Sequence, residues 1–419
     1  MMSRILIEGG TPLAGAVDVH GAKNAVLPIL AATVLSEGVH VIHNCPKLKD
    51  VSITVEMLRY LGAKVTREDD TLIVDTRGHL GNHIPEKLMR ELRSSIVFMG
   101  AILARNKRAK ISAPGGCELG PRPIDLHIKA LRELGASIRE SHGYIICNGS
   151  QMRGANIHLS FPSVGATENI MLAACLTEGR TVIENVAKEP EILDLQNFLN
   201  RMGAKISGAG SSQITIDGVK ELYAAEYTVM PDRIVAATYL CGAAASGGRV
   251  EIRKVVPEHL SATLSVLRES GCEISSGEDW VSLCAPERLQ AVREITTMPY
   301  PGFPTDAQSL FLAMLAVADG TSIIKETIFE SRFKPAEELV RMGADITVDG
   351  RIAIVQGVKK LSGATVSAKD LRGGAALVIA GLCAEGVTEV ENPCYIDRGY
   401  AHLVEAFEQL GAKIKRVEY

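Results

Sequence analysis

Residues 58–66 read LRYLGAKVT, and five later segments repeat the pattern of this stretch. They are LRELGASIR (131–139), LNRMGAKIS (199–207), LRESGCEIS (267–275), LVRMGADIT (339–347) and FEQLGAKIK (407–415). The shared glycines are spaced by 73, 68, 68, 72 and 68 residues and are Gly62, Gly135, Gly203, Gly271, Gly343 and Gly411. A period as regular as this predicts six copies of one supersecondary unit.

Each repeated segment predicts the end of a helix and the start of a hairpin. Apolar residues before the glycine follow helical spacing, for example Leu195, Leu199 and Met202, and the glycine stands where a helix C-cap is expected. A short strand, a polar turn such as Asp349-Gly350 and a second strand follow. This order of residues is typical of a β-hairpin.

Every unit also contains a second helix, which is apolar on nearly all sides. These predicted helices span residues 22–35, 92–105, 164–177, 233–246, 306–318 and 371–384. A helix without a polar face must be buried. One unit is too small to bury it, so we expect the six units to close around common axes in two groups of three.

The two ends of the chain complement each other. Residues 5–24 resemble residues 352–371 but have no preceding helix, whereas the sixth repeat ends with one strand and lacks a partner strand. We therefore predict a first domain of residues 22–229 and a second of residues 1–21 plus 230–419. The chain would cross between them near Gly21 and Met230, and the active site is expected in the cleft between the domains.

Composition favours a small-molecule enzyme of the cytoplasm. The net charge of −4 and an aromatic content of only 4% argue against a nucleic-acid-binding surface. Nine cysteines without a CxxC pair do not form a disulfide framework. The sequence shows neither an apolar signal segment nor a run of membrane-spanning length, and it leaves the oligomeric state open.

The first residues of the apolar helices are rich in polar groups. Helix N-termini offer unpaired amide donors and the positive end of the dipole, so a converging set predicts a site for phosphate and carboxylate groups. Helix capping is the alternative for the aspartates and for Thr305, but it does not explain the cations. The groups are Lys23-Asn24, Arg93 to Ser95, Ser163 to Thr167, Asp232-Arg233, Thr305-Asp306 and Asp370 to Arg372.

The loop APGGCELGPRPIDLH (113–127) differs from the connections of the other units. It is rich in glycine and proline around a single cysteine and a single arginine, and we expect a mobile lid. Arg122 is near enough in sequence to favour a thiolate at Cys117. No second cysteine or suitably spaced histidine accompanies Cys117, so no metal site is expected.

With these motifs, the sequence resembles the UDP-N-acetylglucosamine 1-carboxyvinyltransferase family, which catalyses the first committed step of peptidoglycan synthesis. The motifs occur in the family's order over nearly the whole chain. They are GAKNAVLP, PKLKDV, PGGCELGPRPIDLH, SVGATENIMLAA, EPEI, PDRI, FPTDAQ, FESRF, DLRGG and IDRGY. The resemblance implies an α/β fold of two inside-out α/β barrel domains with three units each, which agrees with the six repeats.

The resemblance also implies the site residues. Those matching the phosphoenolpyruvate and catalytic positions are Lys23, Asn24, Cys117, Arg122, Arg332, Asp370 and Arg398. Those matching contacts to the nucleotide sugar are Asn24, Arg93, Arg122, Pro123, Ile124, Asp125, Leu126, Ser163, Val164, Gly165, Asp306 and Ile328. The expected substrates are phosphoenolpyruvate and UDP-N-acetylglucosamine, and no metal or organic cofactor is expected.

The implied chemistry assigns two leading roles. Asp306 would take the proton of the sugar 3-hydroxyl, and Cys117 would protonate the enol carbon or add to it. Three alternatives remain: the related 3-phosphoshikimate 1-carboxyvinyltransferase, a catalytically silent relative that senses nucleotide sugar, and a repeat scaffold that binds a protein. The cysteine-bearing loop argues against the first. The enzyme is favoured over the other two by the joint retention of Lys23, Cys117, Asp306, Asp370 and Arg398.

Overall fold

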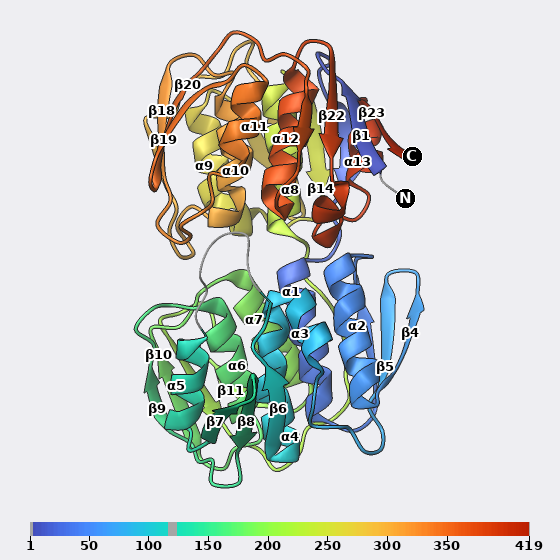
Figure 1. The fold of residues 1–419 in the computed structure, drawn as a ribbon, viewed down its shortest axis with the longest axis vertical. Helices are drawn as coiled ribbons and strands as arrows, with labels where there is room; N and C mark the ends of the chain where they lie inside the picture. Colours follow the sequence, from blue (N-terminus) through green and yellow to red (C-terminus); the bar gives the residue numbers. More distant parts are fainter. Residues whose placement is uncertain (1–2, 116–123, 419) are drawn as a thin grey trace. The chain divides into compact units, whose positions relative to one another are not determined.

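The structure is a computed structural model and describes residues 3–115 and 124–418 (Figure 1). These residues divide into two compact units. The internal unit contains residues 21–115 and 124–230, and the terminal unit contains residues 3–20 and 231–418. Each unit repeats one arrangement of helices and strands three times, and we describe the two units separately.

The apolar helices form the interior of each unit. In the terminal unit, α8 (Arg233–Ala245), α10 (Thr305–Leu315) and α12 (Leu371–Cys383) pack against one another. In the internal unit, α4 (Phe98–Asn106) packs against α1 (Lys23–Ala32) and α6 (Val164–Ala174). Two predicted helices are shorter than expected, because η1 (Thr33–Leu35) follows α1 and η2 (Arg93–Val97) precedes α4 as separate 3₁₀ turns.

The amphipathic helices end at the repeated glycines, as predicted. All six glycines have positive φ, between +87° and +112°, a conformation that glycine adopts without a Cβ penalty. The second repeat has no glycine after its apolar helix, and there Lys107 takes the left-handed conformation instead. The amphipathic helices are α2 (Lys49–Leu61), α5 (Asp125–Glu133), α7 (Pro190–Arg201), α9 (Ser261–Glu269), α11 (Pro335–Arg341) and α13 (Leu403–Gln409), and α3 (Glu86–Glu91) is an additional short helix.

A hairpin follows each amphipathic helix. Five hairpins are continuous in sequence: β4 (Lys64–Glu68) with β5 (Thr71–Asp75), β7 (Ser137–Ser141) with β8 (Tyr144–Asn148), β11 (Lys205–Ser207) with β12 (Gln213–Asp217), β15 (Glu273–Ser276) with β16 (Trp280–Cys284), and β19 (Asp345–Asp349) with β20 (Ile352–Gln356). The sixth pair joins the chain ends, because β1 (Ser3–Glu8) runs antiparallel to β23 (Lys413–Glu418). The expected complementarity of the ends is therefore present.

Each hairpin is extended by the strand that follows an apolar helix. These strands are β3 (Val39–His43), β6 (Arg108–Ser112), β10 (Arg180–Glu184), β14 (Arg249–Arg253), β18 (Thr321–Lys325) and β22 (Val387–Glu391). In five sheets a short parallel strand pairs with them: β13 (Glu226–Thr228), β9 (Asn156–His158), β2 (Ala14–Asp18), β17 (Glu294–Thr296) and β21 (Thr365–Ser367). At β6, an isolated bridge between His83 and Lys110 replaces this strand.

The parallel pairs show where the chain passes between the units. β9, α6 and β10 form a β-α-β unit, as do the elements around α10 and α12. Around α1 and α8 the leading strands are exchanged: β2 precedes α1 in sequence but pairs with β14, and β13 precedes α8 but pairs with β3. The two crossings of the chain therefore lie between β2 and α1 and between β13 and α8.

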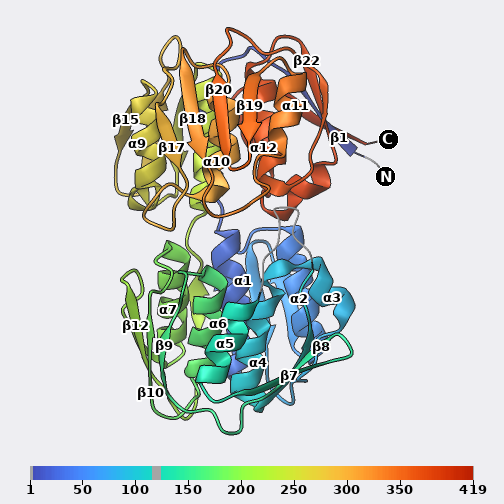
Figure 2. The ribbon, with the colours of Figure 1, turned by 60° about the vertical axis from the view of Figure 1, so that its left-hand side comes forward.

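Helices lie inside and sheets outside in each unit (Figure 2). The six sheets are separate in the described residues, with three or four strands each, rather than one continuous closed sheet. The remaining 3₁₀ turns are η3 (Pro257–Leu260) and η4 (Pro393–Arg398). None of the described helices has both the length and the apolar character required to cross a membrane.

Asp194 on α7 fixes the segment that leaves the internal unit. Its Oδ1 accepts a hydrogen bond from the Tyr227 hydroxyl at 2.6 Å, and its Oδ2 accepts one from the Met230 N–H at 3.3 Å. Burial raises the pKa of Asp194 to about 6, although both hydrogen bonds lower it. The ionised carboxylate is therefore costly in the folded chain.

This cost predicts how stability depends on pH. Because the folded-state pKa lies above the unfolded one, the contribution of Asp194 is fully present below about pH 4 and is lost as pH rises through 6. Asp194→Asn cannot ionise, so between pH 4 and 7 the unfolding free energy of the wild type should fall by roughly 2 kcal/mol more than that of the variant. Urea unfolding at several pH values measures both slopes, and parallel slopes would contradict the assignment.

Candidate active site

The carboxylate of Asp306 lies between two arginine side chains of the terminal unit. Asp306 is the second residue of α10. Its Oδ1 accepts a hydrogen bond from Nη2 of Arg332 at 2.7 Å, and its Oδ2 accepts one from Nη2 of Arg372 at 3.1 Å. Both arginine side chains are 2% exposed, whereas the Asp306 side chain is 28% exposed. The structure thus joins two buried cations to a carboxylate that solutes can reach.

Acidic residues stand at the starts of the three apolar helices of this unit, but they do not all cap their helices. Asp232 caps α8 by accepting hydrogen bonds from two backbone N–H groups at 2.9 and 3.1 Å. Asp370 caps α12 in the same way, at 3.0 and 2.9 Å. In the described chain α10 has no side-chain cap. Capping therefore explains Asp232 and Asp370, but it is the wrong explanation for Asp306 and Thr305.

The guanidinium of Arg372 has more donors than the described residues have acceptors for it. Its Nε and Nη1 are buried and have no hydrogen-bond partner among the described residues. The guanidinium lies over the ring of Tyr400, with Cζ 5.3 Å from the ring centroid. Burial alone would lower the pKa of Arg372, but Tyr400, Asp306 and Asp232 together raise it above its usual value. Buried donors without an acceptor are rare, so Arg372 is an unusual feature of this helix start.

The other predicted residues of the terminal unit lie in loops around these helix starts. Ile328 is half-buried in the loop between β18 and α11, the loop that also carries Arg332. Arg398 is half-buried and is the last residue of η4, which packs against α12. The sequence singled out Arg372 only as a cation opposed to the helix dipole, and it gave no sign that Arg372 contacts Asp306.

In the internal unit, Lys23 forms an ion pair that the sequence did not predict. Lys23 begins α1, and its Nζ lies 3.3 Å from Oδ2 of Asp50, in the first turn of α2. The side chains are 14% and 2% exposed, respectively. Asn24 is the next residue of α1 and is half-buried. The structure therefore holds the predicted phosphoenolpyruvate-binding lysine at a fixed position between two helices.

A second group in this unit forms around the start of α6. Ser163 caps α6 by accepting a backbone N–H at 3.3 Å. The buried ring of His127 on α5 lies 3.0 Å from Nδ2 of Asn169. Burial and then the nearby charge of Arg93 lower the pKa of His127 to about 4, so this imidazole is neutral at pH 7. A Cβ on Gly165 would stand 3.2 Å from Cε1 of His127, so glycine allows the two helices to approach.

The predicted nucleotide-sugar residues of this unit come from three neighbouring segments. Arg93 begins η2, which packs against α6, and α5 also packs against α6. Asp125 is exposed, and the half-buried residues of the set are Arg93, Ile124, Leu126, Ser163, Val164 and Gly165. Reachable side chains and the free amides at the start of α6 therefore lie on elements that contact one another.

Three predicted residues, Cys117, Arg122 and Pro123, lie outside the described residues. The other cysteines can be compared with one another. Cys45 is buried, and burial raises the pKa of its thiol to about 12. The same effect raises the pKa of the Cys147 and Cys175 thiols to about 12. Among the described cysteines only Cys394 is exposed.

These differences predict the pattern of thiol labelling. We expect a small epoxide that resembles phosphoenolpyruvate to modify Cys117 first, because thiolates react and Arg122 is close in sequence. Peptide mass mapping over time measures each site. Cys394 is the control for exposure alone, so labelling of Cys394 at the rate of Cys117 would contradict a special reactivity of Cys117.

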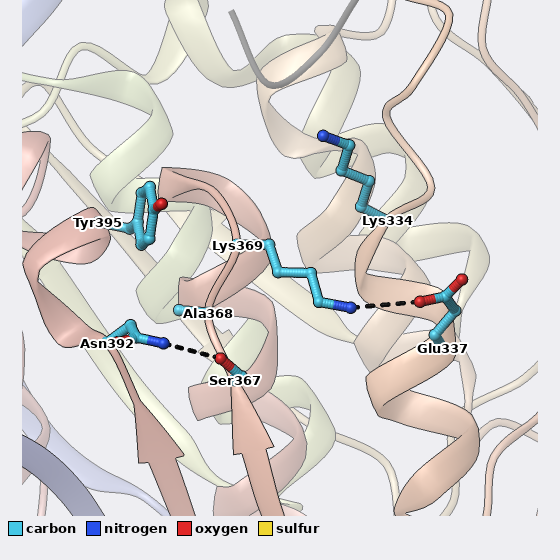
Figure 3. A pocket seen from close by; sticks show the side chains of 7 residues that line it. All are labelled: Lys334, Glu337, Ser367, Ala368, Lys369, Asn392 and Tyr395. Carbon is cyan, nitrogen blue, oxygen red and sulfur yellow. Dashed lines mark hydrogen bonds and ion pairs between the residues drawn. The ribbon is translucent and has the colours of Figure 1, made fainter.

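A cavity of about 420 Å³ in the terminal unit contains none of the predicted site residues. Figure 3 shows Lys369 extended toward Glu337 and Asn392 toward Ser367, at 3.2 and 2.9 Å. The remaining lining residues are Lys334, Ala368 and Tyr395. Because Lys369 and Asn392 are already paired within the protein, this cavity is a poorer candidate for an anion-binding site than the region around Arg372.

Comparison with known proteins identifies the family of this chain. The model of the EPSP synthase (3-phosphoshikimate 1-carboxyvinyltransferase) family matches residues 7–407. UDP-N-acetylglucosamine 1-carboxyvinyltransferase 2 of Caldanaerobacter subterraneus is 58% identical and covers 99% of this chain and 100% of the relative. UDP-N-acetylglucosamine 1-carboxyvinyltransferase 1 of Symbiobacterium thermophilum is 53% identical, with 99% and 95% covered.

Solved structures show the same fold. The enolpyruvyl transferase NikO from Streptomyces tendae aligns with a TM-score of 0.89 at 26% identity, covering 99% of each chain. EPSP synthase from Acinetobacter baumannii aligns with a TM-score of 0.76 at 18% identity over 100% of each chain, which supports the fold alone. The chain therefore belongs to the enolpyruvyl transferases, within the family of the UDP-N-acetylglucosamine 1-carboxyvinyltransferases.

Proposed function

We propose that this protein transfers the enolpyruvyl group of phosphoenolpyruvate to the 3-hydroxyl of UDP-N-acetylglucosamine and releases phosphate. The names of relatives that are 46 to 58% identical over the full chain support this reaction. The observation that carries it is Asp306, a half-exposed carboxylate that is not used as a cap and is held by two buried arginines. This reaction is the first committed step of peptidoglycan synthesis.

Asp306 is the proposed general base. Two guanidinium groups hold its carboxylate in one orientation, and its exposed part can accept the proton of the sugar hydroxyl. As that proton leaves, the oxygen bonds to C2 of phosphoenolpyruvate, and Cys117 gives a proton to the methylene carbon. The product of this addition is a tetrahedral ketal. Loss of a methyl proton and cleavage of the bond to phosphate then give the enol ether and inorganic phosphate.

The cations around the two helix groups are proposed to bind the anionic parts of phosphoenolpyruvate. Lys23, Arg122, Arg332 and Arg398 would carry this role, and Arg372 would add a buried positive charge beside Asp306. Such fixed donors stabilise charge as it moves from the enol to the leaving phosphate. Asp370, a cap of α12, would act by holding the Arg372 backbone.

The residues around the start of α6 are proposed to bind the nucleotide sugar. Free amides at a helix N-terminus and Arg93 suit a diphosphate. Asn24 and the residues 122–126 and 163–165 would complete this contact, together with Ile328 and Asp306. The proposal therefore requires residues from both units, and substitutions in either one should reduce transfer.

Phosphate release measured with each acceptor tests the proposal. Phosphoenolpyruvate with UDP-N-acetylglucosamine should give rapid release and an enolpyruvyl product by mass spectrometry, whereas shikimate 3-phosphate should give none. Release only with shikimate 3-phosphate would assign the related enzyme. Binding of UDP-N-acetylglucosamine in calorimetry without any turnover would identify a silent sensor and reject the transfer.

A further inference from the structure

Glu326 is a buried carboxylate that has no direct part in the proposed reaction. It follows β18 and is 2% exposed. Its Oε1 accepts hydrogen bonds from the Thr297 hydroxyl at 2.9 Å and from the backbone N–H groups of Ile328 and Phe329 at 2.8 and 3.0 Å. Its Oε2 accepts the Thr305 hydroxyl at 2.9 Å. A carboxylate removed from water requires donors of this kind.

The two oxygens of Glu326 connect two parts of the candidate site. Oε2 holds Thr305, the residue before Asp306 in the uncapped first turn of α10. Oε1 holds the amides of the loop that leads to Arg332. Arg332 in turn donates from Nε to the Thr305 carbonyl at 3.2 Å and from Nη2 to Asp306 at 2.7 Å. The loop and the helix start are thus joined in a closed network.

Glu326 is itself fixed by the neighbouring sheet. Its backbone N–H donates to the Arg351 carbonyl at 2.9 Å. Thr297, which follows β17, accepts the Thr327 N–H at its hydroxyl at 2.9 Å and the Thr327 hydroxyl at its carbonyl at 2.5 Å. The Glu326 carboxylate is therefore held in place by the sheet, and both the loop and α10 are hydrogen-bonded to it.

We propose that Glu326 is a positioning residue of the transfer reaction, which fixes Asp306 and Arg332 relative to each other through Thr305 and the amides of residues 328 and 329. The inference rests on the proposed function, in which Asp306 is the base. Its physical reason is that α10 has no side-chain cap among the described residues, so that the orientation of its first turn depends on Glu326. A displacement of about 1 Å at a catalytic group can reduce the rate on the order of 100-fold.

Three variants separate positioning from general stability. Thr305→Val removes only the hydrogen bond between Glu326 and α10. Glu326→Gln keeps one side-chain oxygen that can accept from the loop amides. Glu326→Ala removes the hydrogen bonds to α10 and to the loop. We expect turnover to fall about 10-fold for Thr305→Val and Glu326→Gln and on the order of 100-fold for Glu326→Ala. In Thr305→Val the KM for the nucleotide sugar should stay within about twofold, because the loop amides remain held.

Glu338 provides a matched control. It is a buried carboxylate of the same unit, 5% exposed, that accepts the Ser367 N–H at 3.2 Å and pairs with Lys369 at 3.2 Å. Glu338→Gln should leave turnover per folded molecule unchanged. In a double-mutant cycle, Glu326→Gln should add little to Thr305→Val, because both act on one bond. Fully additive losses, or an equal loss in Glu338→Gln, would overturn the proposal.

A measurement made without substrate tests the positioning role of Glu326 independently of the proposed reaction. The Arg332 Nε–H is buried and hydrogen-bonded to Thr305, so its proton should exchange slowly with water in NMR spectra of the wild type. Exchange should quicken in Glu326→Gln and Thr305→Val but not in Glu338→Gln. If the wild type releases no phosphate, the proposed function fails while this comparison still stands. Unchanged exchange in both variants rejects the positioning role.

Discussion

Replacement of Asp306 by Asn should lower turnover by roughly 100- to 10,000-fold, the range that general-base catalysis contributes. The amide keeps the size of the side chain and one acceptor for an arginine, but it cannot take the proton of the sugar hydroxyl. Affinity for UDP-N-acetylglucosamine should change far less. Steady-state rates of phosphate release and calorimetry of nucleotide-sugar binding measure the two quantities.

Asp319 offers a control for this substitution. It lies after the other end of α10, is 58% exposed and pairs with Arg288 at 3.0 Å on the surface. Asp319→Asn should leave turnover within about twofold, because exposed ion pairs contribute little. If Asp306→Asn loses binding in parallel with rate, Asp306 recognises the sugar and does not act as the base.

Replacement of Arg372 by Met should lower turnover on the order of 100-fold without lowering the melting temperature. Two nitrogens of this arginine are buried without acceptors in the part of the chain that the structure describes, and such groups cost stability. Exchange of a buried charged side chain for an apolar one is often neutral or stabilising. In Arg372→Met, Asp306 would still pair with Arg332 and would still be partly exposed to water. The substitution would therefore leave no buried charge without a partner.

Arg332→Met is the matched variant for comparison. Arg332 is equally buried, but it donates to both the Thr305 carbonyl and Asp306, so its loss should reduce both stability and turnover. Thermal unfolding and rate measurements on the two variants give the contrast. An equal loss of stability in Arg372→Met would show that Arg372 serves the fold, and its proposed role beside Asp306 in the reaction would be wrong.

Most of the candidate site residues could be named from motifs, but their roles could not. Lys23, Arg93, Asp306 and Arg372 stand at the starts of apolar helices in the sequence, and the structure places them there. Which acidic residue caps a helix depends on side-chain orientation. Asp370 turns to its own backbone, whereas Asp306 turns to arginines that are 26 and 66 residues away. No local pattern encodes such a choice.

The sequence by itself determined the repeat, the buried helices, the glycine caps and the pairing of the chain ends. These features can be read from the chain because they depend on a repeated residue pattern, on apolar surface and on the left-handed conformation that glycine allows. Only the tertiary structure decided the ion pair of Lys23 with Asp50, the contact of Arg372 with Asp306 and the network of Glu326. The reason is that strand partners and buried polar contacts are selected by which distant segments pack together, where an unpaired polar group would be costly.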